Sequence, residues 1–270
     1  MTVVSAFLVP GSPLPLLRSD VLPWGRLASG FERAGRALAA STPDALLIYS
    51  TQWLAVLDQL WQTRPTLSGR HVDENWYEHG ELEYAMTIDT ELTYACLAAS
   101  PRIGISSKAV NYDGFPIDTG SIVATRFLLG SKEIPVVLAS NNLYHSNEQT
   151  EQLGAMAVQC AQELGKRVSV IGVGGLSGSI FRHEIELRAD KIFSDADDQW
   201  NKRMLDLMER GDMVEAAAQT PNFATEARAD MGFKHFSWVL GGTGRRCYGA
   251  RVHAYGPTYG AGAAVVEFKL

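Results

Sequence analysis

The chain has 270 residues, of which 46% are apolar and 20% are charged, a composition typical of a soluble globular protein with a substantial core. Its formal net charge of −6 argues against a nucleic-acid partner, because a phosphate-binding surface requires clustered lysine and arginine. No apolar run approaches the ~20 residues that a membrane-spanning helix needs, and the amino-terminus lacks the basic region of a secretory signal. We therefore expect no nucleic-acid partner and no membrane partner.

The cysteine content indicates a reducing compartment. Cys96, Cys160 and Cys247 are widely spaced, and no C-x-x-C pair occurs. A zinc ribbon or a redox dithiol is therefore not expected. Because an odd, sparse count of cysteines is typical of the cytoplasm, we expect a cytoplasmic protein.

Predicted strands and helices alternate along the chain. The strands read as short, continuous apolar runs, which indicates a sheet buried on both faces. The expected strands are Val3–Val9, Ala45–Tyr49, Ile103–Val110, Pro135–Ala139, Val168–Val173, Ala250–Tyr255 and Ala263–Phe268. The expected helices are Trp24–Ala40, Asp89–Ala99, Thr119–Leu129, Glu148–Leu164, Asp195–Arg210 and Met213–Gln219. This order predicts one α/β domain over residues 1–270, with a central, mostly parallel or mixed sheet covered by helices.

Three loops that follow predicted strands are the expected location of a site, because the crevice of such a sheet lies beyond the carboxyl ends of its strands. These loops are Pro10–Leu14, Ser50–Trp53 and Gly174–Phe181. A further segment, Arg64–Tyr84, is polar and rich in aromatic residues, with weak periodicity. We expect it to form a long excursion at the surface or at an interface with a partner.

Several local motifs match known sites only in part. Gly172–Ser177 lacks the third glycine of a dinucleotide fingerprint, and Gly175–Ser179 lacks the second glycine of a nucleophile elbow. His183 has no second histidine four residues later, so we expect it on a surface helix and not in a metalloprotease site. His145, which follows the fourth predicted strand, is a candidate for a functional role.

Six short segments occur in a common order that extends along essentially the whole chain. They are Phe7–Pro13, Asp44–Trp53, Ile134–Val137, Ser140–Asn142, Gly174–Ser177 and Phe236–Trp238. Together they resemble the class III extradiol ring-cleavage dioxygenases of the protocatechuate 4,5-dioxygenase type. Within that family, the chain resembles the α subunits of the two-subunit enzymes that cleave 2-aminophenol. The resemblance implies the extradiol dioxygenase fold.

The family holds Fe(II) with two histidines and one carboxylate, which leaves three positions for substrate and dioxygen. The resemblance places Gly11 and Gln52 where the two histidine ligands stand, and Gly178 where an acid–base histidine stands. Asp230 is the better match for the family carboxylate, and Glu226 is the alternative. Further candidates for the pocket lining are Ser12, Trp53 and His145.

These replacements leave too few nitrogen ligands for a ferrous ion, because glycine offers no side chain and an amide oxygen is a weak donor. Substrate deprotonation would also lack its general base. We therefore expect no metal, no cofactor and no catalytic residue in this chain. The resemblance implies a non-catalytic α subunit of a heterotetramer with two α and two β chains. The homologous β subunit would carry Fe(II) and cleave 2-aminophenol with dioxygen to 2-aminomuconate 6-semialdehyde.

Two alternatives stay open. The chain could be an active extradiol dioxygenase whose rearranged metal site recruits His145, His183 or His235. It could also be a metal-free regulatory subunit that keeps the old pocket for an aromatic ligand. Iron analysis of the isolated chain tests the first alternative, and titration of the iron-free chain with 2-aminophenol tests the second.

Overall fold

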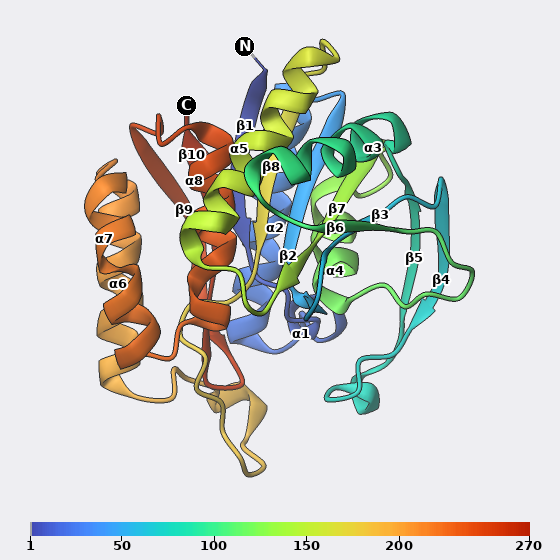
Figure 1. Ribbon diagram of the computed structural model, residues 1–270. Coiled ribbons are helices and arrows are strands. Elements are labelled where there is room, and N and C mark those ends of the chain that lie inside the picture. The colour runs from blue at the N-terminus through green and yellow to red at the C-terminus, as the bar shows by residue number, and fades with distance from the viewer. Residues whose placement is uncertain (1) are drawn as a thin grey trace.

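The computed structural model describes residues 2–270, and its main feature is an eight-stranded mixed sheet between two layers of helices (Figure 1). The strands are β1 (Val3–Val9), β2 (Ala45–Ala55), β3 (Gln59–Gln62), β6 (Ser107–Val110), β7 (Val136–Asn142), β8 (Val168–Val173), β9 (Gly249–Thr258) and β10 (Ala261–Lys269). They lie in the order β6–β3–β7–β2–β8–β1–β10–β9. The four strands from β7 to β1 are parallel, whereas β10 and β9 are antiparallel additions at one edge. The predicted α/β fold with a mostly parallel or mixed central sheet is confirmed.

Helices cover both faces of this sheet (Figure 1). One face carries α3 (Thr90–Ala99), α5 (Asn147–Glu163), α6 (Asp195–Glu209), α7 (Met213–Glu226) and α8 (Lys234–Thr243). The other face carries α2 (Leu22–Ser41), which follows the short α1 (Leu14–Leu17), and α4 (Thr119–Leu129). No helix within residues 2–270 combines the length and the hydropathy needed to cross a membrane.

Helix α5 shows how local sequence and packing define one of these elements. The Ser146 hydroxyl accepts a hydrogen bond from the Gln149 amide at 3.1 Å, and the Gln149 side chain accepts one from the Ser146 amide at 2.9 Å. This reciprocal capping box satisfies two backbone donors at the start of the helix. Farther along, Gly154 lets α5 approach α8 closely, because a Cβ atom there would overlap the Trp238 carbonyl oxygen.

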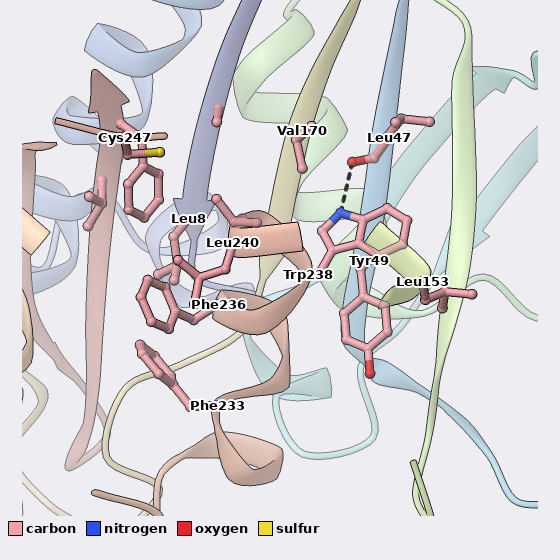
Figure 2. Packing of buried hydrophobic residues seen from close by; sticks show 14 of the residues in the cluster. Leu8, Leu47, Tyr49, Leu153, Val170, Phe233, Phe236, Trp238, Leu240 and Cys247 are labelled. Atoms are coloured by element: carbon pink, nitrogen blue, oxygen red, sulfur yellow. Dashed lines mark hydrogen bonds between the residues drawn. The ribbon is translucent and has the colours of Figure 1, made fainter. Parts of the chain in front are cut away.

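Aromatic side chains dominate the core between α8 and the sheet (Figure 2). The fully buried Trp238 ring stacks on Tyr49 of β2, with 5.6 Å between the ring centroids. The Trp238 indole N–H also donates to the Leu47 carbonyl at 3.4 Å. Phe233 and Phe236 stack nearby, with 5.0 Å between their centroids. Because burial of one such side chain stabilises a fold by roughly 1.5–3 kcal/mol, this packing fixes α8 and the residues that precede it.

The segment Arg64–Tyr84 forms most of a β-hairpin at the surface. β4 (Thr66–His71) pairs antiparallel with β5 (Leu82–Thr87), and a 3-10 turn, η1 (Tyr77–His79), lies between them. The buried side chains Leu67, Leu82 and Met86 join the core on the α4 face. Their spacing follows the two-residue period of a strand over only six residues, which explains why the sequence shows weak periodicity.

The second strand is longer than predicted. Ser50–Trp53, expected as a loop, belongs to β2, which continues to Ala55. In this outer half, buried and exposed residues alternate, as on a strand with one solvated face. The pairing of β2 with β7 shifts in register between Ser50 and Leu54, so the strand is irregular where it reaches the site.

Three other local predictions were wrong. His183 does not lie on a surface helix but in an irregular segment, followed by the 3-10 turn η3 (Leu187–Ala189). The predicted strand from Ile103 begins only at β6, since a 3-10 turn, η2 (Ser100–Ile103), precedes it. Helix α7 continues through Pro221 to Glu226 and does not end at Gln219. Pro221 is exposed, where its missing hydrogen bond is tolerated.

Candidate functional site

A cavity of about 850 Å³ lies beyond the carboxyl ends of β1, β2 and β8. Its lining includes Gly11 and Ser12, which follow β1, and Gln52 from the outer half of β2. Gly178 from the loop after β8 also lines it, as does Asp230 at the start of the 3-10 turn η4 (Asp230–Phe233). The three segments singled out in the sequence therefore surround one cavity.

The Gln52 side chain fills the space into which a side chain at position 11 would extend. A Cβ atom on Gly11 would lie 3.0 Å from both Cδ and Nε2 of Gln52. On the other side, a Cβ atom on Gly120 would lie 3.1 Å from Gln52 Oε1. The amide therefore packs between two glycines, and any larger residue at position 11 requires Gln52 to move.

The Asp230 carboxylate joins three segments of the chain. Its Oδ2 atom accepts hydrogen bonds from the Thr51 hydroxyl at 2.7 Å and from the Gly175 amide at 2.8 Å. The Asp230 amide donates to the Leu176 carbonyl at 2.9 Å. Hydrogen bonds to a charged group stabilise a fold by roughly 1.5–3 kcal/mol each. Asp230 thus fixes β2 and the loop after β8 to the segment before α8.

Position 178 has no room for a side chain. A Cβ atom on Gly178 would lie 2.5 Å from the Arg228 carbonyl oxygen, which is closer than such atoms approach. The Gly178 amide donates to the Ala227 carbonyl at 3.2 Å, and this bond holds the two segments together. An imidazole at this position therefore requires a shift of the backbone.

Three other positions named from the sequence lie outside this lining. Trp53 is buried in the core on the α4 face of the sheet, with 6.2 Å between the centroids of its ring and that of Phe115. His145 follows β7; its burial lowers the pKa of the imidazole, and the Lys234 ammonium acts in the same direction. Glu226 is exposed at the end of α7.

The three histidines of the rearranged-site hypothesis lie in unlike environments. His235 of α8 is fully buried, and neither ring nitrogen has a hydrogen-bond partner in the part of the chain that is described. Burial lowers the pKa of His235 to about 4. His183 is exposed on the cavity rim, whereas His145 is half-buried after β7. Across residues 2–270, no three His, Cys, Asp or Glu side chains come together in a way that could hold a metal ion.

The residues present do not fit a ferrous ion held by two imidazoles and a carboxylate. Gly11 has no donor atom, and Gln52 offers a neutral amide. Asp230 is the one carboxylate matched to the family pattern that lines the cavity, and its Oδ2 atom already accepts two hydrogen bonds. An Fe(II) site of this kind needs two converging imidazoles, and His183, exposed on the rim, is the one histidine among the described residues that line the cavity.

The tip of the β4–β5 hairpin closes one side of the cavity with residues that include Asp73 and Trp76. The Thr119 hydroxyl donates to Asp73 Oδ2 at 2.7 Å and lies 2.6 Å from His71 Nε2. Because the hydroxyl proton is used on Asp73, the His71 nitrogen must be the donor to Thr119. These contacts hold the hairpin against the start of α4.

An aromatic wall, which we define as Trp76, Phe181 and Tyr259, forms another side of the cavity. The centroids of Trp76 and Tyr259 are 4.9 Å apart, and those of Phe181 and Tyr259 are 6.4 Å apart. Tyr259 and Gly260 form the two-residue turn between β9 and β10, both with positive φ. The sequence did not predict this wall. The aromatic-rich segment Arg64–Tyr84 was expected at the surface or at an interface, but its contact with the turn at Tyr259 and Gly260 was not.

Comparison with known proteins identifies the family. Residues 18–266 match the model of the catalytic LigB subunit of aromatic ring-opening dioxygenase. The chain is 50% identical over 271 residues to the 2-aminophenol 1,6-dioxygenase alpha subunit of a Pseudomonas species, over 100% of both chains. It is 27% identical over 288 residues to the beta subunit of a 2-aminophenol 1,6-dioxygenase, also from Pseudomonas, over 99% of this chain and 94% of that one.

Two more distantly related proteins are also similar to this chain. The chain is 21% identical to 3,4-dihydroxyphenylacetate 2,3-dioxygenase of Escherichia coli, over 80% of this chain and 79% of that one. The crystal structure of an uncharacterized protein from Escherichia coli K12 superimposes with a TM-score of 0.69, covering 99% of this chain and 100% of that one. At 12% sequence identity, this likeness concerns the fold alone. As the order of its sequence segments predicted, the chain belongs to the LigB family of aromatic ring-opening dioxygenases.

Proposed function

We propose that this chain is the non-catalytic α subunit of a two-subunit 2-aminophenol 1,6-dioxygenase. One observation carries the proposal: the chain has the fold of a ring-opening family, but Gly11, Gln52 and Gly178 stand where the resemblance implies histidines. The identity of 50% to an alpha subunit, over the full length, supports the assignment to that kind of subunit.

In the proposed complex, the homologous β subunit holds Fe(II) and opens the ring of 2-aminophenol with dioxygen to give 2-aminomuconate 6-semialdehyde. The similarity of this chain to a beta subunit over 99% of its length supports a partner of the same fold. We further propose an α2β2 assembly located in the cytoplasm. The three free, buried cysteines fit a reducing compartment.

The geometry of the replaced positions supports a passive role. The Gln52 amide occupies the space next to Gly11, and the Arg228 carbonyl blocks position 178. Position 178 is therefore closed to a side chain, and a ligand at position 11 requires the Gln52 side chain to move. The alternative of an active enzyme with a rearranged metal site has no supporting cluster of ligands within the described residues.

The test is to express this chain alone, the candidate β subunit alone, and both together. We expect stoichiometric iron in β and in the complex, none above background in this chain, and cleavage of 2-aminophenol only when β is present. Asp230→Asn in this chain keeps an oxygen that can accept from Thr51 and Gly175, so the iron content per complex should not change. Stoichiometric iron together with ring opening in the isolated chain would refute the proposal.

A further inference from the structure

A group of exposed apolar side chains lies at the corner where β2 ends and where β7 leads into α5. We call this group the corner patch, and its members are Leu54, Val56, Leu57, Leu143 and Tyr144. Leu57 and Tyr144 are 82% and 81% exposed. Single exposed apolar residues are common on protein surfaces, whereas a contiguous group of them marks an interaction site.

The topology of the sheet brings the two segments of the corner patch together. In the strand order, β7 lies between β3 and β2, so the connection from β2 to β3 crosses the carboxyl end of β7 (Figure 1). Leu54 pairs with Asn141 of β7, and the Leu143 amide donates to the Ala55 carbonyl at 2.9 Å. The five side chains therefore lie on one continuous surface.

Hydrogen bonds fix the backbone around the corner patch. The Tyr144 amide donates to the Asn142 side-chain oxygen at 3.0 Å, which holds the loop after β7. Across β7, the Gln59 side chain donates to the Ser140 carbonyl at 2.8 Å, which holds the start of β3. Because the backbone needs no ordering when a partner binds, association loses less conformational entropy.

A buried positive charge without a counterion lies beside the corner patch. The Lys234 ammonium of α8 donates to the carbonyls of Asn142 and Leu143 at 2.8 and 3.0 Å. Burial lowers the pKa of Lys234, and no carboxylate of the described residues opposes this effect. A partner that covers the patch removes more water from this ammonium, so a carboxylate on that partner is favoured. A second copy of this chain, placed by a two-fold axis, would bring a second ammonium instead.

We propose that the corner patch is the surface to which the β subunit docks, with apolar side chains against Leu57 and Tyr144 and a carboxylate toward Lys234. This inference rests on the proposed function, because it names the surface through which this chain meets its partner. It places the contact beyond the ends of β2 and β7 and not on the β4–β5 hairpin, whose segment was expected at the surface or at an interface.

The test is calorimetric titration of the full-length chain with the candidate β subunit. Leu57→Asp combined with Tyr144→Ala should raise the dissociation constant at least about tenfold, because both side chains project from the surface and the fold does not depend on them. Val214→Asp is the matched control, since this apolar residue is 69% exposed in the first turn of α7. Thermal melting checks that each variant folds.

The possible results separate this inference from the partner role. If the native chain binds β and the double variant binds it with equal affinity, the corner patch is not the docking surface and the partner role stands. If the native chain does not bind β, the partner role and this inference both fail.

A cross-link identifies the chain that covers the corner patch. Since Cys96, Cys160 and Cys247 are buried, Leu57→Cys provides an exposed thiol that a benzophenone maleimide can label. Irradiation of the labelled complex should join position 57 to the β subunit, and labelled Val214→Cys should not give this product. A product that contains two copies of this chain, or no product with β, overturns the proposal.

Discussion

The buried imidazole of His235 should make the stability of this chain depend on pH between about 4 and 6.5. The ring is 0% exposed in α8, edge-on to Phe233 with 4.9 Å between the centroids, and it has no hydrogen-bond partner among the described residues. Burial disfavours the cation and lowers the pKa of His235 from 6.5 to about 4. The Asp230 charge and the Gly175 backbone oppose this effect more weakly.

The sign follows from proton binding. Between pH 6.5 and pH 4 the unfolded chain binds a proton at His235, whereas the folded chain does not. Stability that is present above pH 6.5 is therefore lost as the pH falls through this window. A lowering of the pKa from 6.5 to about 4 corresponds to a loss on the order of 3 kcal/mol in the free energy of unfolding.

Urea unfolding at several pH values between 7 and 4 measures this loss. His235→Gln cannot titrate, so the free energy of unfolding of the native chain should fall by about 3 kcal/mol relative to that of the variant over this range. His183→Gln is the control, because it removes an exposed histidine without altering the core. If the native chain and His235→Gln lose stability in parallel, the buried imidazole does not control this window and the reasoning fails.

Two further predictions concern stability at neutral pH. Trp24→Phe removes an indole donor that lies 2.8 Å from Asp190, a carboxyl whose pKa is already raised by burial. We expect the free energy of unfolding, measured with urea, to fall by roughly 1.5–3 kcal/mol. Trp53→Phe removes the same atoms from an indole with no described partner, so an equal loss would contradict this reasoning. Gly154→Ala should lower the free energy of unfolding by about 1–3 kcal/mol through a clash with α8. Gly256→Ala, whose Cβ would make only an ordinary contact of 3.8 Å with the Pro23 carbonyl oxygen, should change it by less than about 0.5 kcal/mol; similar values for both would refute the clash.

The central strands could be predicted because they consist of continuous apolar residues, which indicate burial on both faces of the sheet. Val3–Val9 and Val168–Val173, predicted as continuous apolar runs, match β1 and β8 residue for residue. By contrast, β3 is four residues long and pairs with β7 at one described position, Trp61 with Ala139. Such a strand forms because its neighbours are in place, and its own residues carry no sufficient signal.

The same distinction applies to the site. Gly11 and Gln52 could be expected near each other, because the parallel strands of one sheet end at the same edge, although β8 lies between β1 and β2. The aromatic wall could not be expected, since Trp76, Phe181 and Tyr259 come from three segments that meet only through the tertiary fold. The strand ends found in the sequence thus predict which loops form the floor of the cavity, whereas its walls depend on long-range contacts that no local pattern encodes.

The positions matched to the family histidines are coupled to their surroundings, which limits how a metal site could be built in this cavity. Gln52 packs into the space beside Gly11, and a backbone carbonyl packs beside Gly178. Asp230 meanwhile holds two other segments of the chain by hydrogen bonds. A histidine introduced at position 11 alone must displace the exposed Gln52 side chain before its imidazole can face the cavity. Because position 178 has no room for a side chain, and because no single replacement supplies the two imidazoles of an iron site, one substitution does not build such a site in this cavity.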